Sequence, residues 1–234
     1  MKLLVTGANR GLGFYLVKVG LEKGYHIFAG VRNSTPDAMK SLEDLKNTFG
    51  ANLTIVKLDV TDEASVIRAS QQVMTETANL DVIINNAGVL FGRNRTIEEV
   101  DIEECMKTMD INTFGSLRVL KHFLPFVRKG KNQSIINISS DSGSLTNAYS
   151  GDYAYGLSKA ALNMLSEKLH IYLKNDSIRV YSIHPGWMRT DMGGQQASLD
   201  PIVSANGIFQ IIESRPVIAS KYVFIDYKGQ PMEI

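Results

Sequence analysis

The stretch Thr6-Gly-Ala-Asn-Arg-Gly-Leu-Gly13 (TGANRGLG) decides the fold of this chain, and it follows directly on the apolar run Leu3–Val5. Its glycines have the spacing G-x-x-x-G-x-G, which is close to the dinucleotide fingerprint G-x-G-x-x-G at a strand-to-helix junction. Glycine suits such a loop because the turn can require positive φ, and because backbone N–H groups must approach a pyrophosphate closely. An ordinary glycine-rich turn is the alternative. The residues predicted to contact a dinucleotide here are Gly7, Asn9, Arg10, Gly11, Leu12 and Gly13.

A nucleoside-triphosphate loop is disfavoured, because no Lys-Ser or Lys-Thr pair follows these glycines to reach phosphates and magnesium. Along the rest of the chain, short apolar runs alternate with stretches of helical period. The predicted strands are Leu3–Thr6, His26–Val31, Thr54–Leu58, Val82–Asn85, Ser134–Ile138, Arg179–Ile183 and Tyr222–Ile225. Helices are expected to start near Gly11, Asp37, Thr61, Thr96, Tyr153 and Ser198.

This alternation predicts an α/β fold, a single Rossmann-type doubly wound domain over residues 1–234. Its seven-stranded parallel sheet is flanked by helices on both faces. Ligands of such sheets bind beyond the carboxyl ends of the strands, at the point where the strand order reverses. Five unusual segments follow predicted strands and should meet there: TGANRGLG, LDV at residues 58–60, NNAG at 85–88, ISSDSG at 138–143 and HPGW at 184–187.

Composition excludes several classes of partner. The chain has 234 residues with 25 Lys+Arg against 24 Asp+Glu, a net charge of +1, which predicts binding to neither nucleic acid nor an anionic membrane. Cys105 is the only cysteine, so no intrachain disulfide and no cysteine-based zinc site can form. Neither a signal-peptide core nor a transmembrane run is apparent, and we expect a cytoplasmic protein. The four histidines have no ligand spacing, so no metal site is predicted.

The end of the second predicted strand indicates which dinucleotide binds. A carboxylate at that position holds the ribose 2′-OH of NAD and repels the 2′-phosphate of NADP. Here the strand ends Gly30–Val31–Arg32, and Arg10 and Arg32 could both bind a 2′-phosphate through charge-assisted hydrogen bonds. NADP(H) is therefore preferred and NAD(H) remains possible. The alternative is that both arginines are solvated surface residues.

A tyrosine and a lysine in the segment YAYGLSKAALNML supply candidate chemistry. Tyr155 and Lys159 are four residues apart and share one helix face, where the ammonium group could stabilise a phenolate. Ser140 in ISSDSG stands where the fifth strand ends, and its hydroxyl could donate to a carbonyl oxygen. Ser140 could instead cap the next turn, although Ser139 and Ser142 suit that task better. Asn112, in DINTFG, falls inside a long helical pattern. An asparagine without a specific task is mildly unfavourable there, because its amide can hydrogen-bond its own backbone.

Taken in order, these motifs resemble the short-chain dehydrogenase/reductase family over essentially the whole chain, in wording similar to its C-factor-like and sniffer-type carbonyl reductases. The resemblance implies a catalytic tetrad of Asn112, Ser140, Tyr155 and Lys159. Tyr155 is the general acid or base and Ser140 holds the substrate oxygen. Lys159 lowers the phenol's pKa and binds the nicotinamide ribose, and Asn112 organises a water. It also implies that the cofactor contacts Asp59, Val60, Asn85, Ala87, Gly88, Tyr155, Lys159, Pro185, Gly186 and Thr190.

The substrate side is expected to be small, because only the segment near 190–215 can cover it. Candidates to line it are Phe91, Leu145, Tyr149, Trp187 and Met192, an apolar set that suits a hydrophobic aldehyde or ketone and could equally be core. The predicted function is hydride transfer between NADP(H) and a small carbonyl or alcohol substrate. A regulatory or signalling protein of this fold with little turnover is the alternative, and sugar-nucleotide epimerisation is a third. The long helices around Thr96–Arg128 and Tyr153–Lys174 also predict a homodimer or homotetramer.

Overall fold

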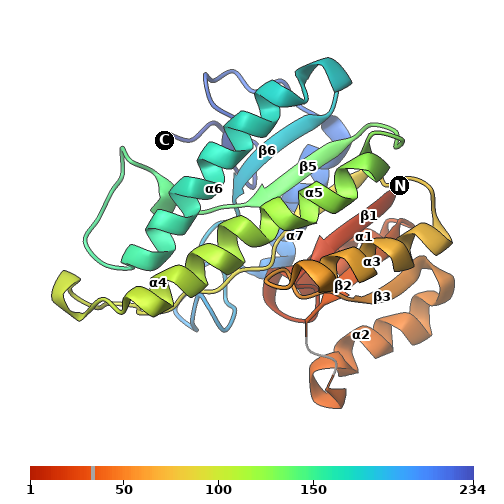
Figure 1. Cartoon of the computed structure of the whole chain (residues 1–234), viewed down its shortest axis with the longest axis horizontal. Coiled ribbons are helices and arrows are strands. Elements are labelled where there is room, and N and C mark those ends of the chain that lie inside the picture. Colours follow the sequence, from red (N-terminus) through yellow and green to blue (C-terminus); the bar gives the residue numbers. More distant parts are fainter. Residues whose placement is uncertain (33–34) are drawn as a thin grey trace.

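The computed structural model describes residues 1–32 and 35–234, and seven of its strands form one parallel sheet. In chain order the strands are β1 (Lys2–Thr6), β2 (His26–Val31), β3 (Leu53–Lys57), β4 (Val82–Asn85), β5 (Ser134–Ile138), β6 (Arg179–His184) and β7 (Phe224–Asp226). They lie in the order β3-β2-β1-β4-β5-β6-β7, so the order reverses between β1 and β4 (Figure 1). The predicted fold class is confirmed.

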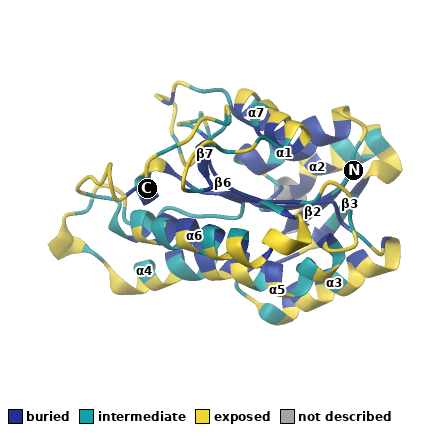
Figure 2. Cartoon of the chain, turned by 90° about the horizontal axis from the view of Figure 1, so that it is seen from above, coloured by how far each residue is buried: buried dark blue, intermediate teal, exposed yellow. Residues whose placement is uncertain are grey.

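Helices cover both faces of the sheet. They are α1 (Gly11–Glu22), α2 (Pro36–Phe49), α3 (Glu63–Glu76), α4 (Ile102–Met109), α5 (Gly115–Val127), α6 (Tyr153–Tyr172) and α7 (Pro201–Ser214). Figure 2 shows three layers, with α1, α2 and α7 on one side of the buried sheet and α3, α5 and α6 on the other. The crossovers between parallel strands require this arrangement, because each helix must return the chain to the other end of the sheet.

Strand residues alternate between two hydrophobic clusters, one on each face. In β1, Leu3 and Val5 belong to the cluster under α1 and α7, whereas Leu4 belongs to the cluster under α3 and α5. Both faces are therefore dry, which explains why the strands read as continuous apolar runs rather than as alternating patterns. Each fully buried side chain of this size contributes about 1.5–3 kcal/mol. The sheet is consequently a rigid platform for the loops at its carboxyl edge.

Two helices, α3 and α7, begin two and three residues later than predicted, because an aspartate rather than an earlier threonine or serine caps each of them. Asp62 accepts a hydrogen bond from the N–H of Ala64 at the start of α3. Asp200 accepts one from the N–H of Ile202 at the start of α7. A carboxylate also interacts favourably with the positive end of the helix dipole, so it is a strong cap.

The helix predicted from Thr96 is not continuous. Thr96 starts a short 3₁₀ turn at Ile97–Glu99, α4 begins only after the cap Asp101, and a π-turn at Asp110–Phe114 separates α4 from α5. Seven α-helices therefore stand, in the described residues, where six were predicted. A π-turn inserts one extra residue per turn and is not visible in hydrophobic periodicity.

The last strand lies two residues beyond its predicted start. The N–H of Val223 donates to the Glu167 carboxylate on α6 instead of to a strand, so β7 begins at Phe224. Within residues 1–32 and 35–234, no helix combines the length and the apolar character that crossing a membrane requires.

Candidate active site

A large cleft opens at the carboxyl edge of the sheet, where the strand order reverses. Its volume is about 840 Å³, and the loops that follow β1, β2, β3, β4, β5 and β6 all contribute to its wall, together with the N-terminal part of α6. All five segments predicted to meet at this edge do so. A cleft of this size suits a large organic ligand rather than a single ion.

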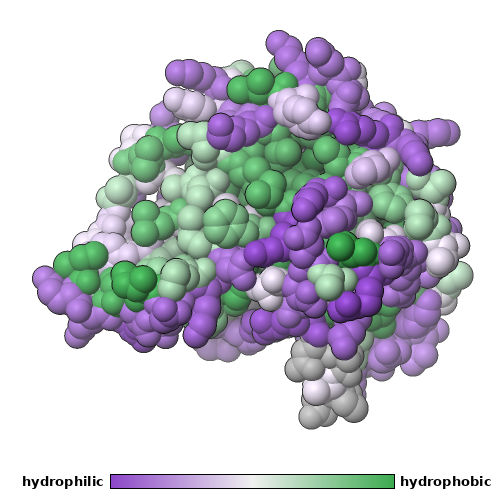
Figure 3. Space-filling model, viewed as in Figure 1, coloured by the Kyte–Doolittle hydropathy of each residue, from purple (hydrophilic) through white to green (hydrophobic). Residues whose placement is uncertain are grey.

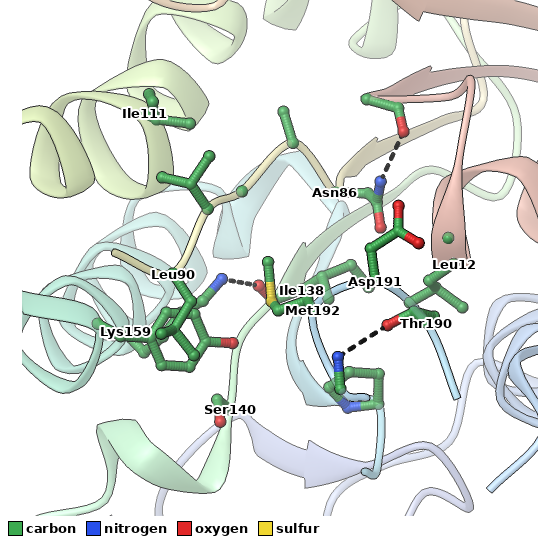
Figure 4. A pocket seen from close by; sticks show the side chains of 18 of the residues that line it. Leu12, Asn86, Leu90, Ile111, Ile138, Ser140, Lys159, Thr190, Asp191 and Met192 are labelled. Carbon is green, nitrogen blue, oxygen red and sulfur yellow. Dashed lines mark hydrogen bonds between the residues drawn. The ribbon is translucent and has the colours of Figure 1, made fainter. Parts of the chain in front are cut away.

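The glycine loop is shaped by close contacts that exclude a larger side chain. A Cβ on Gly13 would lie 2.1 Å from the carbonyl oxygen of Gly7, and Gly7 itself has φ of +64°. Helix α1 can therefore begin directly against the loop only because position 13 is glycine. The side chain of Asn86 donates to the carbonyl oxygens of Thr6 and Gly7 at 2.9 and 3.2 Å and fixes the loop to the end of β4 (Figure 4).

The predicted phosphate-binding residues mostly face the cleft. Gly7, Asn9, Arg10, Gly11 and Leu12 line it, whereas Gly13 lies behind the loop. Arg32 lines the same cleft at the end of β2.

Arg10 has a partner that the sequence did not indicate. Its guanidinium forms an ion pair of 3.3 Å with Asp191, in the loop after β6, and the two side chains are 62% and 80% exposed. Exposed pairs of this kind contribute little to stability. Arg10 is therefore readily available to a phosphate group.

Tyr155 and Lys159 project from the first turns of α6 into the cleft. Lys159 is only 4% exposed. Its ammonium group donates to the carbonyl oxygen of Ile138 at 2.7 Å (Figure 4). The same group lies 5.4 Å from the centroid of the Tyr155 ring. Burial lowers the pKa of Lys159 to about 8 and raises the pKa of Tyr155 to about 12. The sequence predicts instead that Lys159 lowers the pKa of Tyr155. In the structure, burial of the phenol is the largest influence on this pKa, and it raises it.

Ser140 lies beside Tyr155, and a hydrogen bond from Ser140 opposes the rise of the phenol's pKa. The Ser140 hydroxyl also accepts from the N–H of Ser142 and so caps the 3₁₀ turn Asp141–Gly143. The prediction that Ser139 or Ser142 would do this instead is wrong, because Ser139 points into the core. A Cβ on Gly143 would lie 2.6 Å from the carbonyl carbon of Lys159, so this turn packs directly on α6.

Asn112 lies in the π-turn and does not line the cleft. Its amide donates to the carbonyl oxygen of Val89 and to the Ser158 hydroxyl, both at 2.9 Å, and its oxygen accepts from the Val89 N–H at 2.8 Å. Asn112 therefore clamps the loop after β4 to α6. A Cβ on Gly88 would lie 3.4 Å from the Asn112 oxygen and 3.7 Å from Lys159 Nζ, so the three residues are neighbours.

A buried residue that the sequence did not single out fixes α6 against the sheet. The side-chain oxygen of Asn163 accepts hydrogen bonds of 2.6 Å from Ser139, at the end of β5, and from Ser182 on β6. Buried polar groups that are fully paired specify one arrangement of the elements that carry them. Asn163 thereby fixes the register of Tyr155 and Lys159 relative to Ser140. Its position one turn beyond Lys159 is the only signal in the sequence.

The other predicted cofactor contacts divide into two groups. The cleft wall includes Asp59, Val60, Ala87, Gly88, Pro185, Gly186 and Thr190. Asn85, however, is a correction, since it does not line the cleft. It pairs in register with Asn137 on β5, and its amide donates to the Asn137 oxygen at 2.8 Å. Its neighbour Asn86 faces the cleft instead.

On the substrate side, Phe91, Tyr149, Trp187 and Met192 line the cleft as predicted. Leu145 does not, and its side chain is 74% exposed to solvent, which corrects its assignment to the pocket. The sequence did not indicate several other residues that line the cleft, among them Leu90, Arg93, Asn94, Ile111, Asp141, Ser142, Asp152, His184, Met188 and Asp191. Most lie in loops, where no periodic pattern marks the side that faces inwards.

The cleft is compatible with a dinucleotide. The loop Gly7–Gly13 precedes the N-terminus of α1, the position at which helices bind phosphate, and Arg10 and Arg32 lie on the same wall. Thr190 and Asp191, in the loop after β6, lie next to Leu12 of the glycine loop (Figure 4). Among the residues that the structure describes, no group of His, Cys, Asp and Glu side chains could hold a metal ion.

Comparisons with known proteins agree with this geometry. A family model described as short chain dehydrogenase matches residues 2–200. The C-signal protein of Myxococcus xanthus is 38% identical over 155 residues, which are 65% of this chain and 92% of that protein. Carbonyl reductase Sniffer of D. melanogaster superposes with a TM-score of 0.91 at 33% identity, covering 100% of this chain and 99% of that one. An NADPH-bound carbonyl reductase from chicken fatty liver has a TM-score of 0.90 at 30% identity, covering 100% and 98%.

Proposed function

Because the chain belongs to the short-chain dehydrogenase family, we propose that this oxidoreductase transfers hydride between NADP(H) and the carbonyl or alcohol group of a small, apolar substrate. The observation that carries the proposal is the convergence of Ser140, Tyr155 and Lys159 at one end of the dinucleotide-sized cleft. A protein that only senses a dinucleotide has no need of a buried lysine beside a phenol. This convergence favours an enzyme over a regulator without turnover.

Each residue has a distinct task in the proposed reaction. The bound nicotinamide supplies or accepts the hydride. Tyr155 donates its proton to the carbonyl oxygen during reduction and removes the alcohol proton during oxidation. Ser140 holds that oxygen by a hydrogen bond as negative charge develops on it. Lys159 stabilises the phenolate and binds the nicotinamide ribose.

Asn112 acts indirectly, because its side chain is fully occupied by Val89 and Ser158. It keeps the loop after β4 against α6 and so maintains the cleft wall next to Lys159. The sequence assigns Asn112 the task of organising a water. We propose that the π-turn Asp110–Phe114, which contains Asn112, performs this task. The residues Asp59, Val60, Ala87, Gly88, Pro185, Gly186 and Thr190 are proposed to form the dinucleotide's remaining wall.

The substrate is proposed to be a small hydrophobic aldehyde or ketone, since Phe91, Trp187 and Met192 form an open apolar end of the cleft. The experiment that tests the function is a panel of such compounds incubated with the enzyme and NADPH, followed by the loss of reduced-nicotinamide absorbance. Oxidation of NADPH that depends on the carbonyl compound is the expected result. No turnover with any aldehyde or ketone would contradict the proposal.

NADPH is expected to bind more tightly than NADH, because Arg10 and Arg32 face the cleft on the phosphate side. Replacing either arginine with alanine should weaken NADPH binding by about 1.5–3 kcal/mol, roughly 10- to 150-fold, since the hydrogen bond lost is charge-assisted. NADH binding should change little. Titrating both dinucleotides against both variants by nicotinamide fluorescence measures this. Asp191→Asn is the control, because it removes the ion-pair partner of Arg10 and leaves the guanidinium in place.

The chain is further proposed to form a homodimer or homotetramer through α5 and α6. Figure 3 shows a hydrophobic area over these two helices, and its exposed apolar side chains include Phe114, Leu117, Leu157 and Met164. An exposed apolar patch of this kind favours association. Size-exclusion chromatography with light scattering should give a mass of at least twice 25.9 kDa, whereas a clean monomer would contradict it.

The domain organisation and the cellular location are also proposals. Residues 1–234 are proposed to act as one dinucleotide-binding domain, in which the segment near 190–215 covers part of the substrate side. A reducing, cytoplasmic location is proposed because the single Cys105 leaves no possibility of an intrachain disulfide.

A further inference from the structure

The hydroxyl of Ser140 has a charged partner that the proposed reaction does not use. Ser140 Oγ donates to the carboxylate of Asp141 at 2.8 Å, whereas it lies 3.2 Å from the hydroxyl of Ser142. A serine hydroxyl has one proton to donate and two lone pairs with which to accept. A hydrogen bond that Ser140 donates to the phenol oxygen lowers the pKa of Tyr155, and Ser140 cannot donate it while its single proton points to Asp141.

The carboxylate of Asp141 is held where it can act on Ser140. The N–H of Asp141 donates to Nδ1 of His184 at 3.2 Å, and the carboxylate lies 3.6 Å from the same nitrogen. Burial lowers the pKa of His184, so the ring is neutral near pH 7 and Nδ1 is free to accept. The carboxylate is 58% exposed, and solvent therefore supports its charge.

Other charged and titratable groups surround the Tyr155 hydroxyl. Arg93, from the loop after β4, lowers the pKa of the phenol, whereas Asp141 and Tyr149 raise it. Lys159 lies one turn further along α6. Asp152, which precedes α6, accepts from the Tyr149 hydroxyl at 3.2 Å, and Tyr149 is hydrogen-bonded to Ser142 at 2.9 Å. Of the two acids, only Asp141 bonds the serine next to the phenol.

We propose that Asp141 is a positioning residue whose carboxylate takes the proton of Ser140 in a hydrogen bond, so that Ser140 does not donate to the phenol oxygen and the proton stays on Tyr155 until a carbonyl compound binds. This inference rests on the proposed function, because it concerns the proton that reduction consumes. The entering carbonyl oxygen then replaces Asp141 as the acceptor of the Ser140 proton. Tyr155 transfers its own proton to the same oxygen, the two electrons come as hydride from the NADPH of the proposed function, and Asp141 and Ser140 are neither oxidised nor reduced.

The proposal makes a prediction about pH. Reduction requires protonated Tyr155, so its rate falls as pH rises through the phenol's pKa. The negative charge of Asp141 raises that pKa, and removing it must move the alkaline limit of reduction to lower pH. A neighbouring charge typically shifts a pKa by about one unit or more, so we expect a shift of about one pH unit. Oxidation requires deprotonated Tyr155, so the acid limit of alcohol oxidation should move to lower pH by the same amount, because both limits report one ionisation.

Asp141→Asn is the decisive variant, since the carboxamide oxygen can still accept from Ser140 but carries no charge. The charge-matched control is Asp44→Asn, an exposed position on α2 outside the cleft. Profiles of kcat/KM against pH for the wild type and both variants, with NADPH and the best carbonyl substrate, give the measurement. A shift of about one unit in Asp141→Asn alone supports the proposal. An unchanged limit in Asp141→Asn, or an equal shift in the control, overturns it.

A second readout does not need turnover and separates this proposal from the proposed function. Tyrosine labelled with ¹³C at Cζ reports the ionisation of Tyr155 by NMR, with its signal assigned from Tyr155→Phe. The wild-type phenol, with a pKa of about 12, should remain protonated up to high pH, and the Asp141→Asn phenol should begin to titrate earlier. If the enzyme reduces no carbonyl compound, the proposed function fails and this titration still tests Asp141. Identical titrations of Tyr155 in the wild type and in Asp141→Asn would overturn the proposed role of Asp141.

Discussion

Tyr155→Phe is expected to lower carbonyl reduction by about 10²–10⁴-fold, the usual contribution of a general acid. Phenylalanine keeps the ring that packs near Lys159 and removes only the hydroxyl that donates the proton. The dinucleotide should bind as before, because we propose that its phosphate end binds at the glycine loop and not at this residue. The loss should therefore appear in kcat and not in the dissociation constant of NADPH.

Steady-state kinetics and a fluorescence titration of NADPH on the same preparations measure both quantities. Tyr153→Phe is the matched control, since it removes a hydroxyl from the same helix, two residues earlier, outside the cleft. Its kcat should be close to that of the wild type. A Tyr155→Phe enzyme that retains most of its rate would remove the proton donor from the mechanism and assign catalysis to another group.

Gly13→Ala is expected to have the second large effect, and it acts on structure before chemistry. The added methyl group would lie 2.1 Å from the carbonyl oxygen of Gly7, and neither the loop nor α1 can move without disturbing the other. Overpacking of this kind usually costs about 1–3 kcal/mol of the free energy of unfolding. Because the loop must shift, NADPH binding should weaken by at least about tenfold, the equivalent of 1.4 kcal/mol.

Thermal unfolding with and without NADPH separates the two consequences. Gly24→Ala is the control, because Gly24 has φ of +77° with nothing within 4 Å of its Cβ position, and it lies at the opposite end of α1. That variant should lose stability through backbone strain and keep the full stabilisation by NADPH. If Gly13→Ala also kept the full stabilisation by NADPH, the glycine loop would not be the phosphate site.

Much of the fold follows from short-range sequence signals. The runs Leu3–Val5 and Val82–Ile84 lie in central strands buried on both faces, so their apolar character is continuous and easily recognised. The elements that were misplaced depend on other kinds of interaction. The π-turn at Asp110–Phe114 leaves no periodic trace, and β7 begins at Phe224 because Glu167, 56 positions away, takes the N–H of Val223.

The candidate site shows the same division. Tyr155 and Lys159 could be paired from their spacing, because four residues are one helical turn. Asn85 and Asn86 could not be told apart, since the choice depends on Asn137 in the neighbouring strand. Leu145 and Arg93 lie in loops, and only the packed chain shows that the first points to solvent and the second into the cleft.

By itself, the sequence determined the class of fold and the edge of the sheet where the cleft lies, because local periodicity and glycine spacing encode them; the reactive side chains remain a prediction that rests on the resemblance to a known family. The tertiary structure alone decided their chemical state. Burial raises the pKa of Tyr155 and lowers that of Lys159, and the proton of Ser140 points to Asp141. These properties depend on desolvation and on neighbours brought together by folding. The loop TGANRGLG predicts where a dinucleotide binds, and the packing around Tyr155 sets the conditions under which its proton can move.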